Sequence, residues 1–333
     1  MNEASPDIPR VLVTGGAGYV GSHACKALKA AALLPVTYDN LSRGHRELVR
    51  YGPFEEGDIR DARRLHDVFS HHMPVAVMHF AAFASVGESV EKPWLYYDNN
   101  FVGALTLIEA ARKAGIDKFV FSSTCATYGT PRRQPITEDV PQMPINAYGR
   151  SKLMVEFALR DYGSACGLRS VMLRYFNASG ADPSGEIGEW HDPELHLIPR
   201  ALMAAAGDID ALDMFGTDYA TPDGTAVRDY IHVCDLAEAH VAALRYLQEG
   251  GGTVALNLGT GRGHSAREVL EAARRATGRD IPVRNAGRRA GDPPVLVADV
   301  ALAQETLGFS ARWLDIEAII ASAWVWHDRQ RKF

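Results

Sequence analysis

Apolar runs alternate with amphipathic stretches along the first half of the chain. Residues 10–14 and 36–39 have the pattern of buried strands, and residues 21–32 between them have helical periodicity. The strand pattern returns at residues 75–80, 118–123 and 169–175, with helical stretches between these runs. Strands that alternate with helices indicate right-handed crossovers between parallel strands. The pattern therefore predicts an α/β fold with a doubly wound parallel sheet of the Rossmann type.

The pattern changes after Asn177. Residues 181–199 are rich in Gly, Pro, Asp and Glu and have little periodicity, which predicts a long loop of the kind found at binding sites. Helical patterning resumes at residues 195–203, residues 229–240 end in a helix, and residues 256–259 resemble a strand returning to the sheet. We therefore expect a first domain over residues 1–177, with returning segments near 228–260, and a smaller, interleaved C-terminal domain over 178–333.

Composition excludes several classes of protein. The 333 residues are 47% hydrophobic and carry a formal net charge of −6, which argues against nucleic acid as a main partner. The N-terminal residues have neither the basic nor the apolar region of a signal peptide, and no apolar run is long enough to span a bilayer. The four cysteines are scattered, which fits reduced thiols better than a disulfide framework. We expect a cytoplasmic protein with no membrane or nucleic-acid partner.

A glycine-rich turn follows the first predicted strand. Gly15, Gly18 and Gly21 have the spacing that lets a backbone approach a pyrophosphate at the start of a helix. Asp39 ends the next strand, where a carboxylate can accept hydrogen bonds from ribose hydroxyls and repel a 2′-phosphate. These residues predict a dinucleotide site that favours NAD. Arg43 follows closely, so the sequence keeps NADP open.

Two further segments are candidates for the same site. Asp58 lies where a loop could reach an adenine ring, and its alternative interpretation is a loop that merely enters a helix. The small residues of the 80–82 segment follow an apolar strand and would permit close approach of a cofactor, although they could equally serve packing.

Tyr148 and Lys152 form the candidate catalytic pair. Residues four apart share one face of a helix, so the two side chains would lie side by side. A neighbouring ammonium stabilises a phenolate, so we expect the pKa of Tyr148 to fall from about 10 toward neutrality, as a general base for a hydroxyl requires. Such a pair is weak evidence alone, because many lie on solvated helix faces. Thr124 ends a predicted strand that precedes this pair. The glycine turn, Thr124 and the pair, in that order along the chain, make a much more specific combination.

The segment from His191 to His196 contains two histidines and two acids. Such residues can ligate zinc, but no further ligand follows at a fixed spacing. We therefore predict no metal site.

Six motifs together carry a resemblance to a known family. They lie at residues 14–21, 86–90, 96–100, 121–129, 173–177 and 227–232. With them the chain resembles the extended short-chain dehydrogenase/reductase family, and within it the UDP-sugar 4-epimerases, closest to the bacterial members that serve exopolysaccharide synthesis. The resemblance covers residues 11–326 and is much more specific than a glycine loop.

The resemblance implies an NAD site in the first domain and a UDP-sugar site in the second. The implied NAD contacts are Gly15, Gly18, Tyr19, Val20, Gly21, Asp39, Asn40, Leu41, Ser42, Arg43, Gly44, Asp58, Ile59, Phe80, Ala81, Ala82, Asn99, Thr124, Tyr148, Lys152 and Phe176. The implied substrate contacts are Thr124, Tyr148, Asn177, His196, Leu197, Phe215, Arg228, Arg289 and Asp292. Arginine forks suit a UDP diphosphate, although a surface ion pair is an equally good interpretation of either arginine from spacing alone.

The implied activity is an isomerase that interconverts UDP-glucose and UDP-galactose through a 4-keto sugar, with tightly bound NAD that is recycled, in a homodimer. Tyr148 would act as the base, and Thr124 would bind the C4 oxygen. Lys152 would hold the ribose hydroxyls and, with the nicotinamide charge, keep Tyr148 poised to ionise. Leu296 stands where some members carry a tyrosine and others a smaller residue, and Ala290 replaces a common glutamate. UDP-N-acetylhexosamines and UDP-pentoses therefore stay open as substrates.

Two other functions fit the same fold. A nucleotide-sugar 4,6-dehydratase usually has an Asp-Glu pair after the catalytic threonine, whereas Cys125 and Ala126 follow Thr124 here. A catalytically inactive NAD-binding scaffold would have no need to keep Tyr148 and Lys152.

Overall fold

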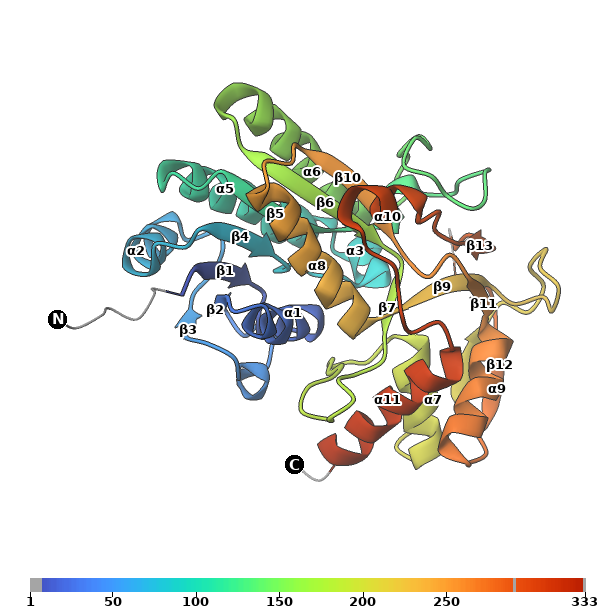
Figure 1. Ribbon diagram of the computed structural model, residues 1–333. Helices are drawn as coiled ribbons and strands as arrows, with labels where there is room; N and C mark the ends of the chain where they lie inside the picture. Colours follow the sequence, from blue (N-terminus) through green and yellow to red (C-terminus); the bar gives the residue numbers. More distant parts are fainter. Residues whose placement is uncertain (1–7, 290–291, 332–333) are drawn as a thin grey trace.

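Seven parallel strands form the large sheet of the computed structural model, which describes residues 8–289 and 292–331 (Figure 1). The strand order is β10-β6-β5-β4-β1-β2-β3. The bounds are β1 Arg10–Thr14, β2 Leu34–Asp39, β3 Phe54–Glu56, β4 Ala76–His79, β5 Lys118–Thr124, β6 Arg169–Tyr175 and β10 Val254–Leu258. All neighbouring strands in this order are parallel, so their carboxyl ends share one edge of the sheet.

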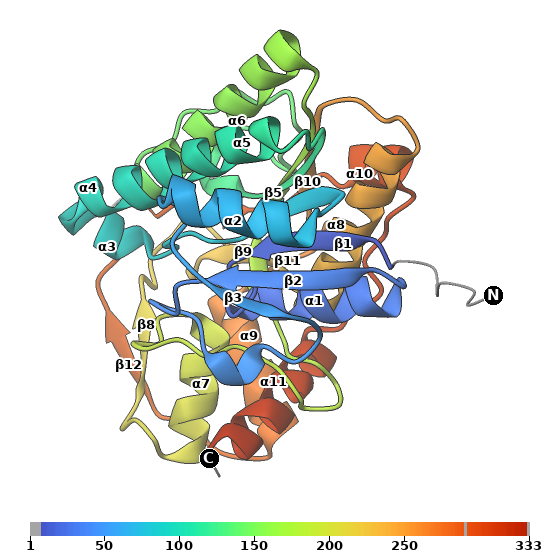
Figure 2. The same ribbon diagram turned by 90° about the vertical axis from the view of Figure 1, so that its left-hand side faces the viewer.

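Helices cover both faces of this sheet (Figure 2). Helices α1 (Tyr19–Ala30), α8 (Val233–Gln248) and α10 (Ala301–Leu307) share one apolar core with it. Helices α2 (Ala62–His72), α5 (Gly103–Lys113) and α6 (Ala147–Cys166) share the other. Val11 and Val13 belong to the first core and Leu12 to the second, because successive strand side chains point to opposite faces.

The second part of the molecule is built around β9 (Val227–His232). This strand pairs with β7 (Asn177–Ser179), β11 (Gly263–Ser265) and β13 (Val295–Leu296), and a separate pair joins β8 (Leu212–Phe215) to β12 (Val283–Ala286). Helices α7 (Leu197–Ala206), α9 (Ala266–Thr277) and α11 (Ile316–Gln330) share a third core. The short helices are η1 Arg46–Leu48, α3 Val86–Glu91, α4 Pro93–Tyr96, η2 Tyr97–Val102 and η3 Cys125–Tyr128.

The predicted α/β fold with its doubly wound parallel sheet is confirmed. Two details differ from the sequence prediction. Helix α1 begins at Tyr19 rather than Gly21, since Gly18 has the extended backbone of an N-cap. Residues 229–240 end in helix α8 as expected, and the strand over residues 227–232 that precedes it was not predicted.

Segments that follow residue 178 return to the large sheet. β10 pairs with β6 at the sheet edge, and α8 packs against α1. The exact limits of the two predicted domains stay a prediction. Across the described residues, no helix combines the length and apolarity that a bilayer crossing requires.

Candidate active site

The glycine turn between β1 and α1 forms a close backbone cradle. Gly15 has a φ of +75°, and a Cβ there would lie 2.4 Å from the Ala81 backbone nitrogen. A Cβ on Gly21 would lie 2.1 Å from the Gly15 carbonyl oxygen. Helix α1 starts at Tyr19 with no side-chain cap at Gly18, so its first turn offers uncapped N–H groups. Such a turn fits the pyrophosphate of a dinucleotide.

Asp39 ends β2 beside this turn. Its carboxylate accepts hydrogen bonds from the backbone nitrogens of Ala17 (3.1 Å) and Leu41 (2.9 Å), and burial raises its pKa. These two bonds fix the carboxylate and leave lone pairs for ribose hydroxyls. The remaining predicted ribose residues, Asn40, Leu41, Ser42, Arg43 and Gly44, form the loop that follows and packs on Ala17.

Arg43 is not available as a free cation for a 2′-phosphate. Its guanidinium pairs with Glu88 at 3.1 Å and also donates to the carbonyl of Asp192. The geometry therefore favours NAD over NADP.

Asp58 follows β3 in the next loop. Arg60 binds both of its oxygens and Asn40 donates to it, and the bonds with Arg60 lower the pKa of Asp58 to about 2. The carboxylate is therefore ionised, and its contact with adenine stays a prediction. Ile59, the next residue, is buried. Among the other predicted cofactor contacts, Phe80, Ala81 and Ala82 follow β4, Asn99 is buried in η2, and Val20 lies in α1.

Thr124, Tyr148 and Lys152 come together where β5 ends beside α6. The Asn146 side chain caps the helix, and this places Tyr148 in its first turn and Lys152 one turn later. The Thr124 hydroxyl accepts a hydrogen bond from the Ala126 backbone nitrogen at 3.1 Å, and it lies near enough to Tyr148 to influence the pKa of the phenol. The structure thus joins the three predicted catalytic residues.

The ionisation of this trio differs from the sequence prediction. Burial raises the pKa of Tyr148, and the nearby Thr124 hydroxyl opposes this only in part. Lys152 Nζ donates instead to the carbonyl of Ser122 at 2.8 Å, and burial lowers the pKa of Lys152 to about 7. Lys152 is thus directed to a backbone carbonyl and does not offset the effect of burial on Tyr148. The pKa of Tyr148 in the protein itself is therefore raised, opposite to the expected lowering, and the expected effect of the nicotinamide charge stays a prediction.

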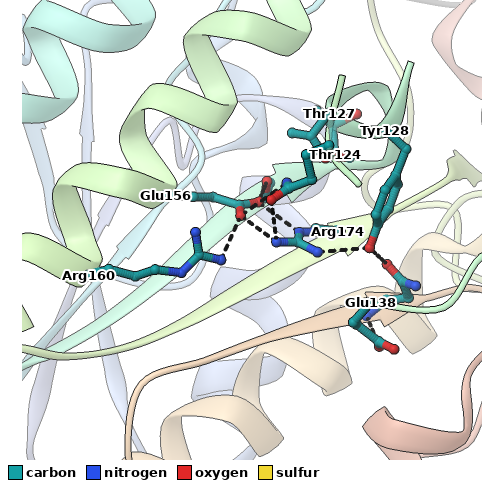
Figure 3. A network of polar contacts seen from close by, with 10 residues as sticks. Thr124, Thr127, Tyr128, Glu138, Glu156, Arg160 and Arg174 are labelled. Atoms are coloured by element: carbon teal, nitrogen blue, oxygen red, sulfur yellow. Dashed lines mark hydrogen bonds and ion pairs between the residues drawn. The ribbon is translucent and has the colours of Figure 1, made fainter. Parts of the chain in front are cut away.

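A buried polar network lies next to Thr124 (Figure 3). Glu156, one turn beyond Lys152, forms an ion pair with Arg174 of β6 at 2.7 Å and accepts a hydrogen bond from Ser123. Arg174 also donates to the Tyr128 hydroxyl at 2.8 Å. The network connects α6 to the strand end that carries Thr124. The sequence analysis missed Glu156, although it continues the four-residue spacing of Tyr148 and Lys152.

Four predicted substrate residues gather in two contacts at the second part of the molecule. Arg228 of β9 pairs with Asp292 at 2.5 Å and donates to the carbonyls of Val227 and Pro293. The guanidinium of Arg289 lies 4.1 Å from the centre of the Phe215 ring. Arg228 thus forms the ion pair that was the alternative interpretation of this residue. Its contact with a phosphate stays a prediction. Ala290 lies outside the described residues.

The other predicted contacts lie at element ends. Phe176 and Leu296 pack in one buried cluster, and Asn177 begins β7. His196 is the N-cap of α7 and Leu197 its first residue. Tyr19 donates from its hydroxyl to the carbonyl of Gly180 at 2.6 Å, which ties the glycine turn to the chain after β7.

The comparisons with known proteins agree with this geometry. The model of the NAD dependent epimerase/dehydratase family matches residues 11–259. The chain belongs to this family. Its members depend on NAD, and the uncapped glycine turn with Asp39 fits that cofactor.

Relatives within the epimerase/dehydratase family are similar over nearly their whole length. The UDP-glucose 4-epimerase of Rhizobium meliloti (strain 1021) is 56% identical over 97% of this chain and 98% of its own. The crystal structure of UDP-glucose 4-epimerase from Brucella ovis in complex with NAD has a TM-score of 0.93 and 57% identity, covering 95% of this chain and 97% of that one. The crystal structure of UDP-glucose 4-epimerase from Bifidobacterium longum in complex with NAD+ and UDP has a TM-score of 0.93 and 38% identity. The match covers 97% of this chain and 99% of that one.

Proposed function

We propose that the protein is a UDP-glucose 4-epimerase, an isomerase that interconverts UDP-glucose and UDP-galactose with tightly bound NAD. The observation that carries the proposal is that Thr124, Tyr148 and Lys152 meet where β5 ends beside α6, with Thr124 and Lys152 buried and Tyr148 partly buried. The similarity to UDP-glucose 4-epimerases over 97% of the chain supports it.

Inversion at C4 of a hexose requires that one C–H bond is broken and then remade on the opposite face. Tyr148 takes the proton of the 4-hydroxyl while C4 is oxidised, and it returns a proton after the 4-keto sugar has turned over. The Thr124 hydroxyl hydrogen-bonds both the C4 oxygen of the sugar and Tyr148. It thereby keeps the group that loses the proton close to the group that accepts it. When bound, NAD+ supplies the hydride acceptor and donor at C4 and adds a positive charge.

Burial of Tyr148 gives this site a specific property. Because burial raises the pKa of the phenol, the proton stays on Tyr148 until cationic charge lies beside it. Lys152 supplies part of that charge, and its ammonium is suited to hold the ribose hydroxyls. Turnover is thereby coupled to a correctly filled cofactor site.

The UDP portion would lie over the second part of the molecule. Within residues 8–289 and 292–331, Arg289 pairs with no carboxylate, whereas Arg228 pairs with Asp292. Arg289 is thus the better placed of the two arginines to bind a diphosphate. Arg228 would bind the diphosphate either in place of Asp292 or together with it. Phe215 and Leu197 would complete the nucleotide contacts.

Sugar selectivity is assigned to Leu296. This side chain is buried against Phe176, so its branched body forms a fixed wall next to a predicted cofactor contact. Such a wall admits UDP-glucose and UDP-galactose more readily than their N-acetyl forms. UDP-N-acetylhexosamines and UDP-pentoses are the second candidate substrates.

The proposal is tested with protein purified without added cofactor. UDP-glucose should convert to UDP-galactose with no NAD added, and acid denaturation should release NAD. The matched control is Tyr148→Phe, which should keep the cofactor and lose turnover. Recovery of NADP alone would contradict the cofactor, and an inert wild-type protein that carries NAD would favour a scaffold.

We further propose that the enzyme is a cytoplasmic homodimer. All four cysteines are free, as a reducing compartment allows. Trp94, Val102 and Phe157 are 67%, 47% and 54% exposed on the adjoining α4, η2 and α6, and a second copy would cover such apolar side chains. Light scattering after gel filtration should give twice the mass of the chain, and Phe157→Asp should reduce it to one chain.

A further inference from the structure

We infer that Glu189, His191, Glu194 and His196 form a binding site for a divalent cation of the zinc class. One ligand atom from each of the four residues can be chosen so that all lie within 4.8 Å of one another. The sequence predicts no metal site, because the 191–196 segment offers no additional ligand at a fixed spacing. The fold supplies that ligand from the other direction, since Glu189 precedes the segment.

The distances match the size of a tetrahedral zinc site. His191 Nδ1 lies 3.2 Å from a Glu189 oxygen and 3.4 Å from a Glu194 oxygen. His196 Nδ1 lies 2.6 Å and 3.4 Å from oxygens of the same two carboxylates. Zinc ligands at about 2.0–2.1 Å in a tetrahedron are about 3.3 Å apart. Only the contact of 2.6 Å, a hydrogen bond, must open, and its proton leaves to solvent when the ion binds.

The two carboxylates of this cluster are buried. The side chains of Glu189 and Glu194 are only 7% and 8% exposed, and both are paired with His191 and His196, so a divalent cation would take the place of the protons that these pairs share. His191 Nδ1 is shielded from solvent and makes no hydrogen bond with a described residue, although two carboxylate oxygens lie within 3.4 Å. A cation held between this nitrogen and the two carboxylates would satisfy all three groups at once.

The backbone around the cluster is already fixed. Trp326 Nε1 donates to the carbonyl of Glu189 at 2.8 Å. A Glu194 oxygen accepts hydrogen bonds from the backbone nitrogens of Leu195 (2.7 Å) and His196 (2.8 Å). The edge of His191 meets the Tyr19 ring, with 6.2 Å between ring centres. The ligands are thus held before any ion arrives, which lowers the ordering cost of binding.

Four protein ligands close the coordination sphere, so the site is structural rather than catalytic. An ion here would join the loop after β7 to the N-terminus of α7, where His196 and Leu197 are predicted substrate contacts. Coordination through Nδ1 leaves Nε2 of His196 free to meet a ligand. The cation would therefore fix the wall of the UDP-sugar site.

A second group, Glu55, His71 and His72, provides an internal control. It offers only three ligands, and Arg64 and His72 already bond the Glu55 carboxylate. We expect no comparable affinity there.

The test uses full-length protein without a histidine tag, stripped with a chelator and then titrated with Co²⁺. Wild-type protein should bind about one equivalent and show the visible absorption of tetrahedral cobalt. Zn²⁺ should displace it. Glu194→Gln and His191→Ala should lose the band and weaken binding by more than the roughly 10–100-fold that outer-shell changes cost. His72→Asn should keep both.

Thermal unfolding and circular dichroism show whether the variants fold. Zn²⁺ should raise the Tm of wild type and of His72→Asn and leave that of Glu194→Gln unchanged. The inference is overturned if wild type shows no tetrahedral band, if the band survives in both ligand variants, or if it disappears in His72→Asn. These readouts do not depend on epimerase activity.

Discussion

Replacement of Glu156 by Gln tests the buried network behind the active site. The Glu156 side chain is fully buried, and the paired Arg174 side chain is 3% exposed. Arg174 donates from Nη2 and Nε to the two carboxylate oxygens at 2.7 and 3.0 Å, and Ser123 donates to the same carboxylate. The variant keeps the shape of the side chain and one acceptor oxygen, but it removes the charge that balances the guanidinium.

The expected loss follows from the charge left behind. A buried guanidinium without its carboxylate costs about 3–5 kcal/mol of unfolding free energy. That is a large fraction of the roughly 5–15 kcal/mol that stabilises a typical domain. The matched control is Glu317→Gln, which breaks a pair with Arg275 of similar length, 2.7 Å, at the surface. Water solvates both partners there, so the control should change little.

The assay is urea unfolding of the NAD-saturated proteins, followed by tryptophan fluorescence and circular dichroism. A double variant, Glu156→Leu with Arg174→Met, removes both charges and should recover much of the lost stability. The reasoning is refuted if Glu156→Gln loses no more than Glu317→Gln, or if the double variant is less stable than the single one.

Further predictions concern catalysis, selectivity and pH. Tyr148→Phe should lower kcat by about 10²-fold or more while UDP-sugar binding survives, and Thr124→Val should be milder because it removes a hydrogen bond rather than the base; near-normal turnover of the tyrosine variant would exclude it as the base. A steric wall at Leu296 should favour UDP-glucose over UDP-N-acetylglucosamine by about 1–3 kcal/mol, measured from the ratio of their kcat/KM values. Leu296→Ser should narrow this ratio, and an unchanged ratio would place the selectivity elsewhere. Burial lowers the pKa of His240 to about 4 in the folded protein. The contribution of neutral His240 to folding stability is therefore complete above the unfolded pKa near 6.5, and it is lost as pH falls toward 4. Between pH 7 and pH 5, urea unfolding should therefore show wild type losing about 2 kcal/mol more unfolding free energy than His240→Leu; equal losses would mean that folding does not lower the pKa of His240.

The sequence predicted the parts of the site that depend on local spacing. The glycine turn, Asp39 at the end of β2, and Tyr148 beside Lys152 each follow from periodicity or from the position of a residue in one element. The returning strand β10 was also visible, because it is short, apolar and bounded by glycines.

Features that depend on distant segments were not accessible. Glu189 joins His196 only because the loop after β7 folds back on itself, and Arg43 loses its free charge to Glu88, which lies 45 positions along the chain. The pKa of Tyr148 was predicted in the wrong direction, because spacing gives neighbours but not burial. Lys152 is directed to the Ser122 carbonyl by the end of β5, which no pattern in α6 reveals.

The central claim is that the hydrogen on C4 leaves and returns to the same carbon within one active site. UDP-glucose carrying deuterium at C4 tests it directly, in ordinary water and without added NAD. The account predicts UDP-galactose that keeps its C4 deuterium, with no net accumulation of NADH. Loss of the deuterium to solvent, or NADH formed in step with product, would contradict it.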